Sequence, residues 1–310
     1  MHTAKQLHAL ADRCVKCGMC LPHCPTYHLT RDESESPRGR IALIQGLTGG
    51  QLAYSDKLGT HLENCLKCRA CERVCPSIVP YGELIDGALT HIERTITAPP
   101  ARRRLALLNL ATQRGALHAF ARLLRFYQRS GLRALLRRSG MLKLLGLARH
   151  DHLLPALPAV HIWQTYYPAQ NTARGDVALF TGCIADAFDQ ATSHAAIQVL
   201  TTLGYGVQVP SAQRCCGALH LHNQQPEQAT ALAQDNLAAF GTPNVQAIIH
   251  TASGCGATLS EYAQLDPHST GFTRKVIDIS TFFASVPWPK NATLKPLESR
   301  VAVHDPCSLT

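Results

Sequence analysis

CVKCGMCLPHCP, residues 14–25, is the stretch that decides the fold of the first part of this chain. Its four cysteines follow the spacing C-x2-C-x2-C-x3-C, and proline comes directly after the last of them. The same spacing recurs in CLKCRACERVCP, residues 65–76, where every cysteine lies 51 positions after its counterpart. Two copies of this spacing in register are typical of a protein that binds two [4Fe–4S] clusters.

The spacing also predicts which thiolates share a cluster. Three closely spaced cysteines can ligate three irons of one cubane, whereas the turn at proline carries the fourth toward the other cubane. We therefore expect a crossed arrangement, in which each motif completes its partner's cluster. The first cluster is assigned Cys14, Cys17, Cys20 and Cys75. The second cluster is assigned Cys24, Cys65, Cys68 and Cys71.

Zinc and disulfides are the alternatives for these thiols. Structural zinc sites pair two C-x2–4-C knuckles rather than three cysteines two apart followed by Cys-Pro. Disulfides belong to oxidising compartments, and the first 14 residues show no apolar signal segment. No run of 18 apolar residues predicts a membrane-spanning helix. We expect a cytoplasmic protein, and the rival of another class is a zinc-binding interaction protein.

Cysteines and charges divide the chain into three regions. Residues 1–95 hold eight cysteines, residues 96–172 hold none and residues 173–310 hold five. Between residues 101 and 150 there are 12 Lys or Arg and no Asp or Glu, whereas the other 260 residues carry 18 basic and 21 acidic side chains. We expect an α+β multidomain protein with a helical ferredoxin-like domain, a basic helical linker and a cysteine-rich α/β domain, in that order.

The basic middle region reads as several short helices. Leucines recur there at three- and four-residue spacing between arginines, and glycines interrupt the pattern. Such helices could dock on the anionic lipid of a membrane face or on an acidic partner subunit, and a solvated face is the alternative. No nucleic-acid-binding motif accompanies the charge, so we expect no nucleic-acid partner.

The last region alternates strand and helix signals. Short apolar runs predict strands within residues 176–183, 206–210, 244–255 and 300–307, and residues 186–203 and 226–240 predict helices. This alternation predicts βαβ units with a mostly parallel sheet. Ligands collect at the carboxyl ends of strands in such sheets. Three cysteines follow predicted strands at these ends: Cys183, Cys255 and Cys307.

A second cysteine constellation belongs to this region. Cys215 and Cys216 are adjacent and precede Gly217, a residue that lets the backbone pass close to a bulky ligand. Either a further iron–sulfur centre or a redox-active thiol site explains this pattern, and ordinary buried core cysteines are the alternative. The candidate residues are Cys183, Cys215, Cys216, Cys255 and Cys307.

The two Cys-Pro motifs, the CCG triplet and their order resemble the cysteine-rich iron–sulfur oxidoreductases, and more finely the iron–sulfur subunit of glycolate oxidase (glycolate dehydrogenase). The resemblance rests on CVKCGMCLPHCPTY, SPRGRIALI, HLENCLKCRACERVCPS, CCG and TASGCGATLSEY. It implies that flavin-containing partner subunits with FAD oxidise glycolate to glyoxylate. This chain would carry their electrons toward a quinone-type acceptor and hold no catalytic residue itself. The absence of a G-x-G-x-x-G fingerprint agrees with a flavin elsewhere.

The sequence differs from the resembled family in two respects. Ala252 stands where the wider family often has a cysteine, three positions before Cys255. VAVHDPC, residues 301–307, resembles the opening of the family's second cysteine-rich half, so we expect that half to be missing here.

A lactate or anaerobic glycerol-3-phosphate dehydrogenase subunit is the alternative function within the same class. Arg38 and Arg40 are expected to orient a turn or to tune a cluster's potential by charge.

Overall fold

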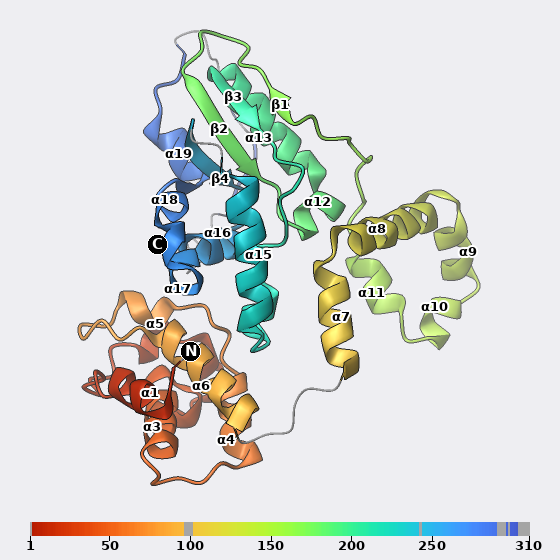
Figure 1. The fold of residues 1–310 in the computed structure, drawn as a ribbon. Coiled ribbons are helices and arrows are strands. Elements are labelled where there is room, and N and C mark those ends of the chain that lie inside the picture. The colour runs from red at the N-terminus through yellow and green to blue at the C-terminus, as the bar shows by residue number, and fades with distance from the viewer. Residues whose placement is uncertain (1, 96–101, 242–243, 290–295, 297, 303–310) are drawn as a thin grey trace. The chain divides into compact units, whose positions relative to one another are not determined.

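The computed structural model describes residues 2–95, 102–241, 244–289, 296 and 298–302 of the chain. These residues form two compact units (Figure 1). The first is built mainly from residues before 106, and the second from residues 106–218 and 227–297. The basic helical segment thus groups with the cysteine-rich region, and the three-part division expected from the sequence stays a prediction.

The described part of the first unit before residue 96 consists of helices joined by turns. The helices are α1 (Ala4–Ala11), α2 (Pro25–Thr30), α3 (Pro37–Thr48), α4 (Asp56–Glu63), α5 (Ala70–Arg73) and α6 (Tyr81–Thr95), with short 3-10 turns η1 (Leu21–His23) and η2 (Glu33–Glu35). Helix α3 begins after Ser36, whose hydroxyl accepts a hydrogen bond from the backbone N–H of Gly39. Pro37 follows at the first helical position, where a missing N–H costs nothing.

The core of the first unit lies between α1, α3, α4 and α6. Its apolar side chains are fully buried, and include Leu7, Ile44, Leu62, Leu84 and Ile85. Burying one such side chain contributes roughly 1.5–3 kcal/mol. The cysteine loops have little regular structure of their own, and four of the eight motif cysteines pack against this cluster from its edge while Cys71 joins it. The helical core therefore holds the loops in place.

Five helices form the basic segment. They are α7 (Arg102–Thr112), α8 (Arg114–Arg129), α9 (Leu132–Arg138), α10 (Met141–Leu144) and α11 (Ala148–Leu153). Gly131 and Gly140 precede α9 and α10 with φ angles of 80° and 72°, a left-handed conformation that glycine adopts without strain. The prediction of several short helices interrupted by glycine is confirmed.

A five-stranded sheet organises the second unit. Its strands are β1 (Tyr166–Tyr167), β2 (Gly175–Phe180), β3 (Tyr205–Gln208), β4 (Val245–His250) and β5 (Val276–Asp278). Their order is β1-β3-β2-β4-β5, and every neighbouring pair is parallel except β1 with β3. The predicted mostly parallel sheet is therefore confirmed.

Helices cover both faces of this sheet. They are α12 (Ile184–Phe188), α13 (Gln190–Thr202), α14 (Ala218–His222), α15 (Pro226–Ala239), α16 (Ser253–Ser260), α17 (Tyr262–Leu265), α18 (Thr270–Thr273) and α19 (Ile279–Ser285), with a 3-10 turn η3 (Pro267–Ser269). Alternate residues of β2 point to opposite faces. Val177 and Leu179 pack with α13 and α19, whereas Ala178 and Phe180 pack with α8 and α15–α18.

Some predicted elements differ from the structure. The helix expected over residues 186–203 is two helices, because the backbone leaves the helical region at Asp189 (φ −139°, ψ 50°). The short strands β1 and β5 had no alternation signal long enough to predict them. Residues 300–302 of the fourth predicted strand have no strand structure, and the rest of it, with Cys307, lies outside the described residues. No described helix is long and apolar enough to cross a membrane.

Candidate functional site

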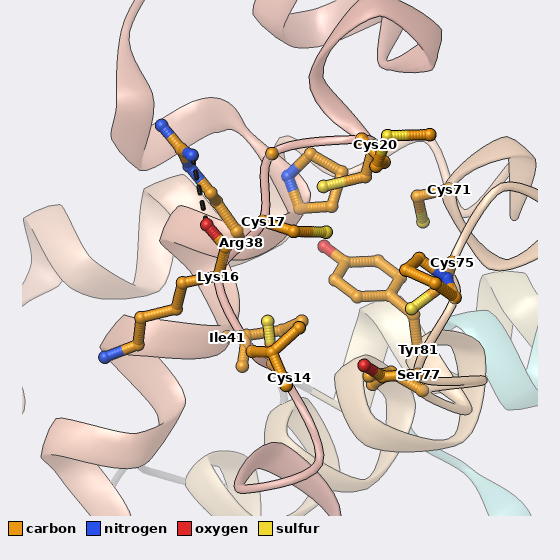
Figure 2. Close-up of a pocket in the computed structure, with 16 residues that line it drawn as sticks. Cys14, Lys16, Cys17, Cys20, Arg38, Ile41, Cys71, Cys75, Ser77 and Tyr81 are labelled. Carbon is orange, nitrogen blue, oxygen red and sulfur yellow. Dashed lines mark hydrogen bonds between the residues drawn. The ribbon is translucent and has the colours of Figure 1, made fainter.

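The first cysteine loop surrounds a hollow of about 410 Å³ that opens to solvent (Figure 2). Figure 2 shows thiols from two separate loops directed into it. The thiols that line it are Cys14, Cys17, Cys20, Cys71 and Cys75. The fold thus brings Cys75 of the second motif beside three cysteines of the first.

A second hollow of about 300 Å³ lies in the same unit. Its thiols are Cys24, Cys65, Cys68 and Cys71. Pro37, Cys71 and Tyr81 line both hollows, so the two share a wall. This grouping is the one that a crossed arrangement requires, although ligation itself stays a prediction.

Left-handed backbone turns shape both loops in the same way. Lys16 and Gly18 have φ angles of 56° and 84°, and Lys67 and Arg69, 51 positions later, have 52° and 59°. Left-handed residues beside right-handed ones turn successive backbone N–H groups toward one concave side, which favours anionic groups. A cubane held by four thiolates is anionic, so the loops suit an iron–sulfur cluster.

Two thiols that line the hollows, Cys20 and Cys71, have a raised pKa. Burial raises the pKa of Cys71, and the neighbouring Cys65 raises it further. Burial also raises the pKa of Cys20, although the backbone N–H of Arg38 opposes this shift. Only thiolates ligate iron, so cluster binding must release these protons.

Each hollow has an arginine–glutamate pair beside it. Arg38 lines the first hollow and pairs with Glu33 at 2.6 Å, and both side chains are partly exposed. Arg40 lines the second hollow and pairs with Glu35 at 2.5 Å, and both side chains are buried. Burial by itself would raise the pKa of Glu35, but hydrogen bonds from Asn64 and His61 and the charge of Arg40 hold it below its usual value.

The cysteines of the second constellation converge at the carboxyl ends of β2 and β4. Cys183, Cys215 and Cys216 are almost fully buried. The sulfur atoms of Cys183 and Cys215 lie 3.4 Å apart, and Cys216 and Cys255 also contact each other. Contact with Cys183 lowers the pKa of Cys215, but Cys216 and burial outweigh it and raise the pKa to about 12. Four candidate thiols therefore share one site, and Cys307 lies outside the described residues.

Two residues that sequence reasoning missed hold the CCG backbone in place. Asn236 is fully buried and donates to the carbonyl of Cys215 at 3.0 Å and to Tyr262 Oη at 2.9 Å. Tyr262 in turn donates to the carbonyl of Cys216 at 3.0 Å. Tyr262 ends the TASGCGATLSEY segment and was within reach of sequence comparison, whereas Asn236 lies in a helix with no motif around it.

Within the described residues, no three His, Cys, Asp or Glu side chains converge closely enough to hold one metal ion. A cubane instead distributes its thiolates over four irons.

Three segments of the chain match known families. Residues 10–79 match the 4Fe-4S dicluster domain, residues 98–154 the linker region of the glycolate oxidase iron-sulfur subunit, and residues 177–260 the cysteine-rich domain. The chain is also 34% identical to the probable glycolate oxidase iron-sulfur subunit of Bacillus subtilis, over 96% of this chain and 70% of that protein. This chain belongs to the glycolate oxidase iron–sulfur subunit family.

Other relatives agree with this assignment. The glycolate oxidase iron-sulfur subunit of Escherichia coli is 31% identical over 99% of this chain and 73% of its own length. A component of the dihydromethanophenazine:CoB–CoM heterodisulfide reductase of Methanosarcina barkeri is 24% identical over 99% of this chain and 70% of its own length. No solved structure matches the chain.

The dicluster match gives this chain two [4Fe–4S] clusters, and the predicted cofactors of the first region are confirmed. Among the described residues, the thiols that line the two hollows fit these two clusters. The basic helical segment corresponds to the family's linker region, and the four converging thiols lie within its cysteine-rich domain.

Proposed function

We propose that this subunit carries electrons one at a time from flavin-containing glycolate oxidase subunits to a quinone-type acceptor, while glycolate is oxidised to glyoxylate on the flavin subunit. The observation that carries the proposal is the shared wall of the two hollows, formed by Pro37, Cys71 and Tyr81. Clusters held on either side of one wall lie close together, and this gives an electron a short path through the subunit.

The crossed ligand set is part of this proposal. Cys75 lines the first hollow with Cys14, Cys17 and Cys20, and Cys24 lines the second with Cys65, Cys68 and Cys71. The left-handed turns beside Cys17 and Cys68 direct backbone N–H groups toward each site. The clusters supply reversible one-electron chemistry, and the protein supplies their thiolates and surroundings.

Among the possible substrates of the complex, we propose glycolate, because relatives from two organisms are named as glycolate oxidase iron-sulfur subunits. Lactate and glycerol-3-phosphate remain the alternatives in the same class. The dicluster match favours iron–sulfur over the zinc-binding alternative. For the cysteine-rich domain, four converging thiols support a further iron–sulfur or thiol redox site.

A peripheral position on a membrane agrees with a quinone-type acceptor. Helix α8 exposes Leu123 and Phe126 by 62% and 63%, beside the exposed Arg122 and Arg129. Arginines flanking exposed apolar side chains suit an anionic lipid surface. In sedimentation with phosphatidylglycerol vesicles, the wild type should be found in the vesicle pellet, and a variant with Arg122→Glu and Arg129→Glu should stay in the supernatant. Equal binding by both proteins would contradict a docking role for α8.

The experiment for the main proposal is co-purification with the flavin subunits, followed by glycolate-dependent dye reduction. We expect Cys65→Ser to abolish electron delivery through this subunit, whereas the exposed Lys57→Ala should leave it unchanged. Full activity in the Cys65 variant would contradict the proposal. Activity with lactate or glycerol-3-phosphate in place of glycolate would move the substrate to the alternative.

A further inference from the structure

Hydroxyl groups contact the sulfur atoms of only one cluster site in the part of the chain that the structure describes. Thr26 Oγ1 lies 3.2 Å from Cys24 Sγ, and Tyr81 Oη lies 3.7 Å from Cys65 Sγ. Both cysteines line the second hollow. Ser77 occupies the matching position of the other motif, 51 residues after Thr26, yet it makes no hydrogen bond to sulfur among the described contacts.

Thr26 must be the donor when Cys24 is bound to iron, because a ligating thiolate has no proton to give. In the structure the Thr26 hydroxyl also donates to the carbonyl of Glu35, at 2.8 Å. That carbonyl already accepts a hydrogen bond from Arg40 Nη1 at 2.6 Å. The same Nη1 donates to Thr26 Oγ1 at 3.0 Å. Arg40 therefore donates both to the Thr26 oxygen and to the Glu35 carbonyl, and the single hydroxyl proton of Thr26 can go to that carbonyl or to the Cys24 sulfur. A ligating thiolate is anionic, and a charge-assisted hydrogen bond to it is stronger than one to a neutral carbonyl that Arg40 already occupies.

The charge of Arg40 acts in the same direction. Its side chain is 1% exposed and lines the second hollow, whereas its partner Glu35 does not line it. The carboxylate of Glu35 is held by His61 at 2.7 Å and by Asn64 at 3.0 Å. The positive end of the pair thus faces the hollow.

The arginine–glutamate pair at the first hollow has a weaker electrostatic effect on its site. The side chains of Arg38 and Glu33 are 33% and 48% exposed, so solvent screens their charges. Burial alone makes it harder to add an electron to a site. Hydrogen bonds to the ligand sulfurs and a nearby buried cation oppose this, because they stabilise the more negative, reduced form. The first site has the backbone N–H of Arg38 at Cys20, whereas the hydroxyl contacts to sulfur and the buried cation both belong to the second site.

We propose that Thr26 and Arg40 are positioning residues that give the second cluster the higher reduction potential of the two. An electron that enters from the flavin subunit then settles at the second site, and no bond is made or broken in that step. The inference rests on the crossed ligand set of the proposed function, and it adds the order in which the two sites fill.

The test is a redox titration of the anaerobically purified full chain, followed by low-temperature EPR. Cys14→Ser and Cys65→Ser variants identify which signal belongs to which site. In the wild type, we expect the Cys65-dependent signal to appear at the higher potential. Thr26→Val removes the hydroxyl and should shift this signal to lower potential, and Thr26→Ser should restore it.

Ser77→Ala is the matched control, because it removes a hydroxyl at the equivalent position of the other motif. It should leave both midpoint potentials unchanged. Arg40→Lys keeps the charge but loses the planar fork that contacts Thr26, so the second midpoint should fall and the first should stay.

The order of the two wild-type midpoints does not depend on a folded Thr26 or Arg40 variant, because only the two cysteine variants are needed to assign the signals. A Cys65-dependent signal at the lower potential would overturn the proposal. So would a Thr26→Val protein with both midpoints unchanged, or one in which only the Cys14-dependent signal moves. Failure of the proposed function looks different, since it would appear as protein without two cluster signals or without electron uptake from the flavin subunits.

Discussion

Arg114 on α8 and Asp186 on α12 are joined by two hydrogen bonds, from Nη2 at 2.7 Å and from Nε at 3.0 Å to the same carboxylate oxygen. Asp186 is fully buried, and it also accepts from His118 at 2.8 Å and from Trp163 at 2.6 Å. It lies three residues after Cys183. One buried carboxylate therefore ties the basic segment to the helix that begins directly after Cys183.

Asp186→Asn should lower the free energy of unfolding of the second unit by about 2–4 kcal/mol, because it removes the charge that compensates Arg114 in a buried position. Both tryptophans of the chain, Trp163 and Trp288, lie in this unit, so tryptophan fluorescence during urea unfolding reports on it. The exposed Arg122→Ala on the same helix is the control, and it should change stability by less than about 0.5 kcal/mol. Equal stability of the Asp186 variant and the wild type would contradict this role.

The same carboxylate predicts how stability depends on pH. Burial by itself would raise the pKa of Asp186, but hydrogen bonds from Trp163, His118 and Arg114 outweigh it and hold the pKa below its usual value. A carboxyl whose folded pKa lies below the unfolded value contributes stability that is fully present above about pH 3.9. That contribution is lost as the pH falls through the folded pKa.

Urea unfolding of the second unit at a series of pH values between 5 and 3 should therefore show a steeper loss of stability in the wild type than in Asp186→Asn. The difference between the two proteins should be largest at the upper end of this range and shrink toward the lower end. Parallel curves would mean that Asp186 titrates alike in the folded and unfolded states.

The crossed arrangement predicts which EPR signal each cysteine controls. Cys75 lines the first hollow although it belongs to the second motif, so Cys75→Ser should impair the signal that Cys14→Ser impairs. Cys24→Ser should impair the signal that depends on Cys65. Iron and sulfide analysis of anaerobically purified variants, with EPR, measures this. Pairing of Cys75 with Cys65 instead would show that each motif closes its own cluster.

The stability of the backbone at the CCG triplet, residues 215–217, should depend more on Asn236 than on Tyr262. Asn236→Ala removes the side-chain partner of the Cys215 carbonyl and of the Arg214 N–H and one of the two hydrogen bonds of the Tyr262 hydroxyl, at a cost of about 2–4 kcal/mol. Tyr262→Phe keeps the ring in its packing and removes one hydroxyl, at a cost of about 1 kcal/mol. Urea unfolding followed by tryptophan fluorescence compares the two, and the reverse order would contradict this assignment.

Local patterns predicted the elements whose signals lie within a few residues of one another. The left-handed turns fall at the same positions in both cysteine motifs, because identical spacing places the same demands on the backbone. The strands β2, β3 and β4 and the helix α15 were predicted from short apolar runs and from glycine just beyond a helix end. The break at Asp189 was missed, since the residues on both sides favour helix and no glycine or proline marks the break. In the fold, α12 packs against α8.

The sequence by itself determined the two cluster-binding motifs and the alternation that produces a parallel sheet, because both depend on spacing along the chain. Only the tertiary structure decided that Cys75 lies beside Cys14, that Arg40 lies against Thr26 and that Asp186 meets Arg114. These pairs are far apart in sequence. Their contact depends on how buried helix faces pack, which no local pattern encodes.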